Sequence, residues 1–172
     1  YYNVRGSLNT FLGHLSGVSN ISGYSNVFIG YQAGCTNTTG YTNVFIGVNS
    51  GIGNTYGACN VMIGFQTGVG NISGTNNTFI GMRSGFDNLT GSYNTFIGYC
   101  ANSSATSGFN SSIAIGAGAL VTGNNQFVLA SSAHPVGTAS TATDYGVGLN
   151  QPSFWLCVKV NGVLGKIPVF GV

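Results

Sequence analysis

Side chains that could perform acid–base, nucleophilic or metal chemistry are rare in this chain. Its 172 residues include two aspartates, Asp87 and Asp144, no glutamate, and two histidines, His14 and His134. Glycoside hydrolysis needs two neighbouring carboxylates, and these aspartates lie far apart in the sequence, so we expect no such pair within one chain. His134 precedes Pro135 and has no acid or nucleophile around it in a triad-like pattern. We therefore predict no enzymatic activity, no metal site and no cofactor.

The same residues have simpler interpretations. Asp87 follows Phe86 where we expect a turn, and aspartate is a common turn residue. His14 holds a position that Tyr31 and Phe65 hold later in the chain, which favours a solvent-facing or partly packed ring. Calcium-binding solenoids carry an aspartate in each turn, whereas the repeats described below contain Asp87 alone.

Charge is nearly absent from the chain. Charged residues make up 3% of it and the net charge is +2, whereas about a quarter of a typical soluble domain is charged. Disordered chains combine low hydrophobicity with high net charge, and this chain has neither. The small, scattered positive charge argues against nucleic-acid binding. No apolar run approaches the roughly 20 residues that span a bilayer, so we expect no membrane insertion.

A 17-residue repeat indicates the architecture. The pentapeptide Asn-x-Phe-Ile-Gly returns at a constant spacing, and two glycine columns and a second asparagine column keep the same period. A fixed period with turn residues in phase indicates one structural unit stacked on copies of itself. The pentapeptides begin at Asn9, Asn26, Asn43, Asn60, Asn77 and Asn94; the glycine columns are Gly6, Gly23, Gly40, Gly57, Gly74, Gly91 and Gly108, and Gly17, Gly34, Gly51, Gly68 and Gly85; the second asparagine column is Asn3, Asn20, Asn37, Asn54, Asn71 and Asn88.

The repeat predicts short β-strands rather than helices, because an interior glycine costs a helix about 1 kcal/mol. Successive side chains of a strand face opposite sides, so Phe28 and Ile29 point in opposite directions. Both are large and apolar, so we expect one face to fill the coil and the other to pack against another copy of the chain. The Phe column is Phe11, Phe28, Phe45, Met62, Phe79 and Phe96, and the Ile column is Leu12, Ile29, Ile46, Ile63, Ile80, Ile97 and Ile115.

These patterns predict an all-β fold, a β-solenoid or β-roll of about seven 17-residue rungs. The glycine columns are expected at corners that need a positive φ or a close backbone approach. The asparagine columns are expected to form amide ladders or to hold turns. Burying one Phe and one Ile contributes ~3–6 kcal/mol, but ordering one such rung costs on the order of 25 kcal/mol. Neighbouring rungs and other chains must supply the difference, so we expect an oligomer.

The pattern changes toward the C-terminus. After Gly108 the next rung is Ser112-Ile113-Ala114-Ile115-Gly116, and after a shorter interval comes Asn125-Gln126-Phe127-Val128-Leu129, which we interpret as a narrowing terminal cap. The tail, Trp155–Val160, Asn161-Gly162 and Val163–Phe170, predicts a β-hairpin with a type I′ turn. The predicted parts are a repeat rod (1–130), an extended connector (131–153) and a C-terminal hairpin (154–172). Because the chain starts in phase with the repeat, we expect it to be the C-terminal piece of a longer protein.

The cysteines and the glycosylation sequons give weaker signals. Cys35, Cys59 and Cys100 fall in three different columns, and with Cys157 they show no metal-type spacing, so we interpret them as free thiols. A disulfide between neighbouring rungs or chains is the alternative. Sequons of the form Asn-x-Ser/Thr matter only where a secretory machinery glycosylates the protein. They begin at Asn20, Asn37, Asn71, Asn76, Asn88, Asn102 and Asn110.

The residues quoted above resemble two related groups of proteins. Ser112-Ile113-Ala114-Ile115-Gly116-Ala117-Gly118 resembles the head repeat of trimeric autotransporter adhesins, and the Asn-x-Phe-Ile-Gly-x-x-x-Gly units resemble repeats of phage and large-virus fibre proteins. The segment from Val158 to Pro168 is similar to the closing segment of viral fibre proteins. The resemblance implies a left-handed parallel β-roll that associates as a homotrimer. The 17-residue spacing exceeds that of the usual adhesin head, and no coiled-coil stalk or membrane anchor is visible, which favours a virion fibre.

The sequence therefore favours a structural and adhesive protein. We expect a virion fibre or spike at the virion surface or in an extracellular setting, forming a rigid homotrimeric rod for surface display or host attachment. A bacterial trimeric adhesin head is the alternative. An ice-binding β-solenoid is a weaker alternative, because other residues interrupt the threonine columns of this chain. Outer aromatics could contact a cell-surface glycan or receptor, or could equally cover the roll and its interfaces. They are Tyr24, Tyr31, Tyr41, Tyr56, Phe65 and Tyr99.

Overall fold

The computed structural model describes residues 3–104 and 107–129 with their side chains, and the backbone of residues 154–160 and 163–169. The chain divides into two units, Tyr1–Pro135 and Val136–Val172, each with its own strands. All regular structure in the described residues is β-strand, which confirms the predicted fold class. The predicted connector, 131–153, lies outside the described residues.

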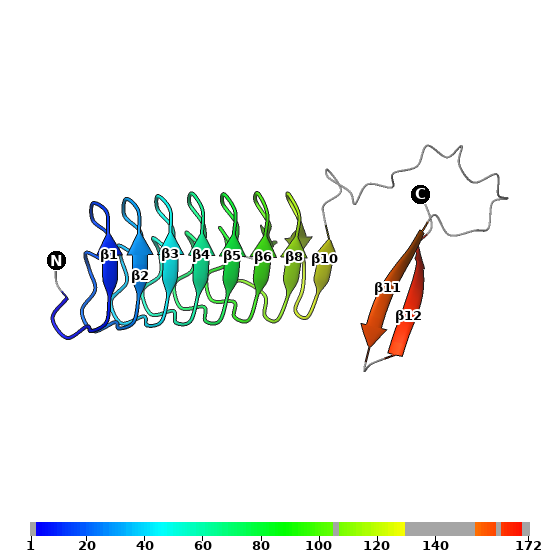
Figure 1. Ribbon diagram of the computed structural model, residues 1–172, viewed down its shortest axis with the longest axis horizontal. Coiled ribbons are helices and arrows are strands. Elements are labelled where there is room, and N and C mark those ends of the chain that lie inside the picture. The colour runs from blue at the N-terminus through cyan, green and yellow to red at the C-terminus, as the bar shows by residue number, and fades with distance from the viewer. Residues whose placement is uncertain (1–2, 105–106, 130–153, 161–162, 170–172) are drawn as a thin grey trace. The chain divides into compact units, whose positions relative to one another are not determined.

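A parallel β-solenoid of about seven turns forms the first unit (Figure 1). One strand from each turn joins an eight-stranded sheet in the order β1-β2-β3-β4-β5-β6-β8-β10. The strands are short because a glycine follows each of the first seven with φ between +122° and +139°, a region that only glycine adopts easily. They are β1 (Thr10–Leu12), β2 (Val27–Ile29), β3 (Val44–Ile46), β4 (Val61–Ile63), β5 (Thr78–Ile80), β6 (Thr95–Ile97), β8 (Ile113–Ile115) and β10 (Phe127–Leu129).

The register of this sheet follows the repeat for six strands and then changes. Phe11 pairs with Phe28 and Phe28 with Phe45, so equivalent residues stack directly. Phe96 then pairs with Ala114, one position further along the chain than the repeat would place its partner. The extra residue falls between β6 and β8, in the turn that carries β7 (Asn102–Ser103). This strand pairs in parallel with β9 (Leu120–Val121) from the next turn, and the two form a second sheet.

The last rung differs from the sequence prediction by one residue. Phe127 pairs with Ile113 and Val128 with Ala114, so Gln126 rather than Asn125 takes the place equivalent to Ser112. Phe127 therefore points outward and is 60% exposed. The physical reason is the narrowed interior: the neighbouring inward residues are alanines, and a valine fits beside them where a phenylalanine does not.

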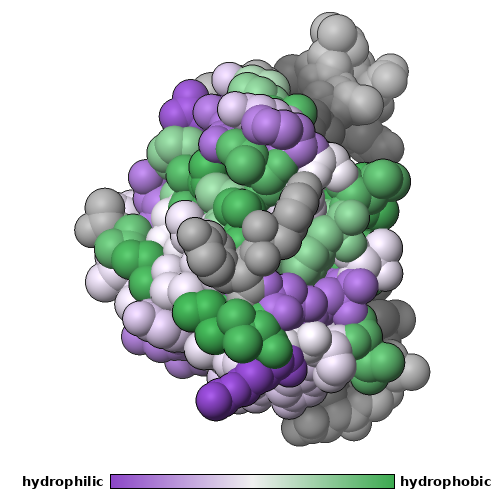
Figure 2. Space-filling model, turned by 90° about the vertical axis from the view of Figure 1, so that its left-hand side faces the viewer, coloured by the Kyte–Doolittle hydropathy of each residue, from purple (hydrophilic) through white to green (hydrophobic). Residues whose placement is uncertain are grey.

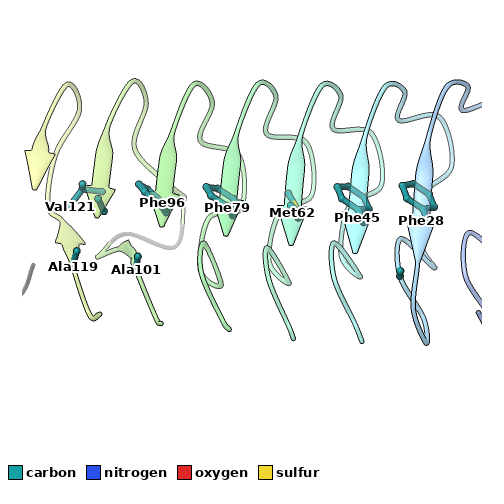
Figure 3. Packing of buried hydrophobic residues seen from close by; sticks show 10 residues of the cluster. Phe28, Phe45, Met62, Phe79, Phe96, Ala101, Ala119 and Val121 are labelled. Carbon is teal, nitrogen blue, oxygen red and sulfur yellow. The ribbon is translucent and has the colours of Figure 1, made fainter. Parts of the chain in front are cut away.

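The Phe column fills the interior of the coil (Figure 3). From β2 to β6 its members are fully buried. The rings of Phe28 and Phe45 are nearly parallel, at 4°, with centroids 4.8 Å apart. Carbon atoms in contact lie about 3.5 Å apart, so parallel rings at this spacing are offset, the arrangement that the ring quadrupole prefers. Met62 interrupts the stack between Phe45 and Phe79 without opening the column, since a flexible thioether fills irregular space.

Two asparagine ladders run beside the Phe column, as the sequence predicts. In one, the Nδ2 of Asn54 donates to the Oδ1 of Asn37 at 2.9 Å and to the carbonyl of Gly57 at 3.0 Å, while its own Oδ1 accepts from Asn71 at 2.8 Å. In the other, the Oδ1 of Asn43 accepts from the backbone N–H of Asn60 at 3.0 Å. These carboxamides are fully buried, so each satisfies its hydrogen bonds within the ladder.

The two glycine columns occupy the predicted corners for two different reasons. Gly51 has a φ of +57°, and a Cβ there would overlap the Phe45 ring. Gly57 has no such φ, but a Cβ there would collide with the Oδ1 of Asn54. The structure also places non-glycine residues in the left-handed region, and the sequence did not reveal these. Leu15, Gln32, Asn49, Gln66, Arg83 and Cys100 form one such column, with φ between 52° and 59°.

The second unit contains two antiparallel strands, β11 (Phe154–Val160) and β12 (Val163–Val169). Val160 pairs with Val163, and Phe154 with Val169. The strands cover the region where the sequence predicts a hairpin. Its predicted type I′ turn at Asn161-Gly162 lies outside the described residues, so that turn stays a prediction.

Deleting one complete repeat, positions 44–60, should leave a folded rod that is shorter by one strand spacing, about 4.8 Å. Asn43 would then be followed by Val61, so the ladders and the interior column close again with Met62 against Phe28. Small-angle scattering and thermal unfolding monitored by circular dichroism measure the length and the stability.

A deletion that is one residue shorter, positions 44–59, is the matched control. It shifts the register of every later rung by one residue at the junction, which turns the inward column outward. This variant should lose cooperative unfolding. Equal behaviour of the two deletions would contradict the strict register.

Asn54→Ala should destabilise the rod by roughly 2–4 kcal/mol, because it leaves buried partners on Asn37, Gly57 and Asn71 without hydrogen bonds. Urea unfolding measures the change. Tyr56→Ala on the same turn removes a side chain that is 60% exposed and should cost much less. The ladder is not a main source of stability if the two variants unfold alike.

Candidate interaction surface

The outer face of the eight-stranded sheet is apolar. The middle residue of each strand from β2 to β6 is fully buried, while the first and third point outward and are partly exposed. Because the strands pair in register, these outward residues form two adjacent columns, which we call the strand face. Its columns are Thr10, Val27, Val44, Val61, Thr78, Thr95, Ile113 and Phe127, and Leu12, Ile29, Ile46, Ile63, Ile80, Ile97, Ile115 and Leu129.

The strand face is comparable in size to the largest apolar patch of a typical monomer. Eight strands span about 34 Å, and two columns about 10 Å wide give roughly 300 Å². The largest apolar patch of a monomer is often a functional surface. The sixteen residues of the face include no charged side chain, and Ile80, Ile113 and Ile115 are 36–37% exposed. Chemically, this surface can bury apolar area against a partner.

The predicted Ile column thus lies on the strand face and the predicted Phe column inside the coil. The sequence identified both columns but not which faces inward, and it did not assign the first strand position to the outer face. The expectation that another copy covers the Ile column stays a prediction. Viewed from the end that carries β1, apolar residues gather in separate patches around the rod (Figure 2).

The outer tyrosines do not form one site. Tyr24 and Tyr41 share a column and stack on each other, with centroids 5.0 Å apart and planes at 5°. Tyr56 and Tyr99 are 60% and 53% exposed and belong to other columns. Sugars stack on the faces of aromatic rings, and the facing sides of Tyr24 and Tyr41 are occupied by each other. The pair is therefore a poorer glycan platform than its exposure suggests.

The few residues suited to chemistry are dispersed. The Oδ2 of Asp87 accepts a hydrogen bond of 2.7 Å from the Nδ2 of Asn102, so this carboxylate is held in a turn, in line with the simpler interpretation. His14 is exposed and stacks on Tyr31 with ring centroids 5.7 Å apart. Asp144 and His134 lie outside the described residues. Among the described residues, no three His, Cys, Asp or Glu side chains gather where they could hold a metal ion.

Among the residues with described side chains, Cys35, Cys59 and Cys100 form no disulfide within this chain, and a disulfide between chains stays an alternative. Cys59 is exposed, whereas Cys35 and Cys100 are partly buried. Burial raises the pKa of the Cys35 thiol, because a thiolate is poorly solvated there. Cys157 is in β11, whose side chains are not described.

Comparison of the chain with family models, with curated proteins and with solved structures finds no match. In the described part of the chain, no helix is long and apolar enough to cross a membrane. The strand face is therefore the candidate site that the geometry itself provides.

Thiol labelling should distinguish the cysteines. A raised pKa means a smaller thiolate fraction at every pH below it, and the thiolate is the reactive species. Cys35, whose sulfur is also partly buried, should therefore react with a maleimide more slowly than the exposed Cys59 at neutral pH. Peptide mass spectrometry after timed quenching measures each rate, and in urea the two rates should converge. Equal rates in the folded protein would contradict this assignment.

Proposed function

We propose that this chain is a structural and adhesive protein, a rigid homotrimeric rod of a virion fibre or spike that serves surface display or host attachment. The observation that supports it is the strand face, an uncharged apolar surface along a rod whose turns are joined by continuous hydrogen-bond ladders. Such a rod has a fixed length, and at every rung it presents an isoleucine or a leucine at the third strand position. The setting at a virion surface or outside cells is proposed from the sequence resemblance.

The free energy of association favours an interface that extends beyond the strand face. Covering roughly 300 Å² of the strand face contributes about 8 kcal/mol per chain. Association costs an estimated 4–15 kcal/mol, so this gain alone is close to balanced. A standard interface buries about 800 Å² on each partner. The proposed trimer therefore also uses flanking outer columns, among them those of Tyr24 and Tyr31, and closes into a ring in which each copy touches two others.

The low charge fits the same function. Neighbouring copies can approach without like-charge repulsion, and the ladders and apolar contacts that hold the assembly depend little on salt. A bacterial trimeric adhesin head would use the same rod and the same face, and the two proposals differ in setting rather than in geometry. The proposed partners are two further copies of this chain and a cell-surface glycan or receptor.

Light scattering after size-exclusion chromatography tests the assembly. The wild-type chain should have three times the chain mass of 17.6 kDa. Ile46→Lys places a charge in the centre of the strand face and should reduce the mass to that of one chain, because a buried unpaired charge is costly. Thr39→Lys, at an exposed position outside the face, is the matched control and should leave the mass unchanged.

A wild-type monomer would remove the argument for a fibre. A trimer that tolerates Ile46→Lys would keep the oligomer but place its interface elsewhere. Circular dichroism of each variant separates loss of assembly from loss of fold.

A further inference from the structure

The structure sorts the seven N-glycosylation sequons into very different environments. Four of them start at members of the buried ladder, Asn20, Asn37, Asn71 and Asn88, because the column two residues later is rich in serine and threonine. At Asn54 the same column holds Tyr56, so that rung has a ladder asparagine without a sequon. The other three sequons lie outside this ladder.

The ladder asparagines cannot carry a glycan in the folded rod. An N-linked glycan replaces one hydrogen of Nδ2. In Asn37 both hydrogens are used, one toward the Oδ1 of Asn20 at 2.8 Å and one toward the carbonyl of Gly40 at 3.1 Å. Asn88 is held in the same way by Asn71 and Gly91. These side chains are fully buried, so no space exists for a sugar.

Asn102 is hindered, whereas Asn110 is not. Asn102 is nearly buried, and its Nδ2 donates to Asp87 at 2.7 Å. Asn110 is exposed, and its Oδ1 accepts from the backbone N–H of Ser92 at 2.8 Å. That hydrogen bond does not involve the Nδ2 to which a glycan is attached.

Asn76 also has the features of an acceptor. It is exposed, in a turn with a φ of +56°, and its Nδ2 makes one long contact of 3.4 Å to the hydroxyl of Thr75. The hydroxyl residue of its sequon, Thr78, is the first residue of β5 and is half-buried on the strand face. A glycan here displaces no ladder bond.

We propose that the folded rod tolerates an N-glycan at Asn76 and at Asn110, and that a glycan on a ladder asparagine prevents its rung from forming. The donor is a lipid diphosphate-linked oligosaccharide. The Nδ2 of the acceptor asparagine forms a bond to the anomeric carbon, the bond from that carbon to the diphosphate oxygen breaks, Nδ2 loses one proton, and the lipid diphosphate leaves. Nothing is oxidised or reduced.

The consequence is that folding and ladder glycosylation exclude each other. A glycosylating enzyme meets the chain while it is extended, before the ladder protects its asparagines. A chain made in such a compartment therefore divides between folded rods that carry a glycan at Asn76 or Asn110 and misfolded chains modified in the ladder. This conclusion does not depend on the number of copies in the rod.

The test uses the full chain behind a cleavable secretion signal in eukaryotic secretory cells. Soluble and aggregated fractions are treated with an amidase that converts each glycan-bearing Asn to Asp in heavy-oxygen water, and peptide mass spectrometry measures occupancy at all seven sequons. Soluble chains should be occupied at Asn76 or Asn110 and bare in the ladder, and aggregated chains should be occupied in the ladder. Soluble chains with occupied ladder asparagines, or soluble chains bare at both Asn76 and Asn110, would overturn the proposal.

A second variant separates glycosylation from the ladder itself. Ser22→Ala, Thr39→Ala, Ser73→Ala and Thr90→Ala together remove the four ladder sequons but keep every ladder asparagine. This variant should raise the soluble yield from secretory cells about fivefold or more, and adding Asn76→Gln should remove the glycan at that site. In bacteria without this machinery, the wild type and the quadruple variant should give similar soluble yields. A gain of the same size in bacteria would assign the effect to the substitutions and overturn the exclusion.

Discussion

The rod depends on the stacking of equivalent side chains at one strand spacing, and this constraint accounts for its composition. Two like charges about 4.8 Å apart repel by about 3.5 kcal/mol at an effective dielectric constant of about 20, and a column repeats that repulsion at every rung. A carboxamide instead donates to the rung on one side and accepts from the rung on the other, as Asn54 does. Stacking therefore selects asparagine over aspartate or lysine at buried polar positions, and 3% of the chain is charged.

The ladders and the interior column also explain the two kinds of glycine. The Asn54 carboxamide lies where a side chain at Gly57 would be, and the Phe45 ring lies over Gly51. Each glycine is thus the complement of a particular larger residue in its own turn. This pairing makes the 17-residue unit a packing module, because the Phe45 ring and the Asn54 carboxamide each meet a glycine of their own turn.

The period, the all-β class and the asparagine ladder could be predicted because those columns hold one residue type in nearly every rung. The left-handed positions of Leu15, Gln32 and Arg83 could not, because their column changes residue type and the corner conformation comes from neighbouring glycines. The last rung was misplaced by one residue because Phe127, Val128 and Leu129 are all apolar and show no alternation. The sequence also could not decide whether the Phe column or the Ile column fills the interior, since both residue types are large and apolar. In the structure the phenylalanine ring is inside, where it packs over the corner glycine.

The residue types in the outer columns of the strand face indicate more about their surroundings than their exposed fractions do. The Ile column holds isoleucine or leucine in all eight strands, although its members are only partly buried. By contrast, the column one corner further on changes freely from His14 to Tyr31, Val48, Phe65 and Met82. Threonine and valine also have a high strand propensity, and they occupy the first strand position in most rungs. Strand propensity alone therefore does not require isoleucine or leucine at the Ile column. A surface that met only water would vary in residue type as the corner column does, so the uniformity of the Ile column supports the proposal that another copy of the chain covers this face.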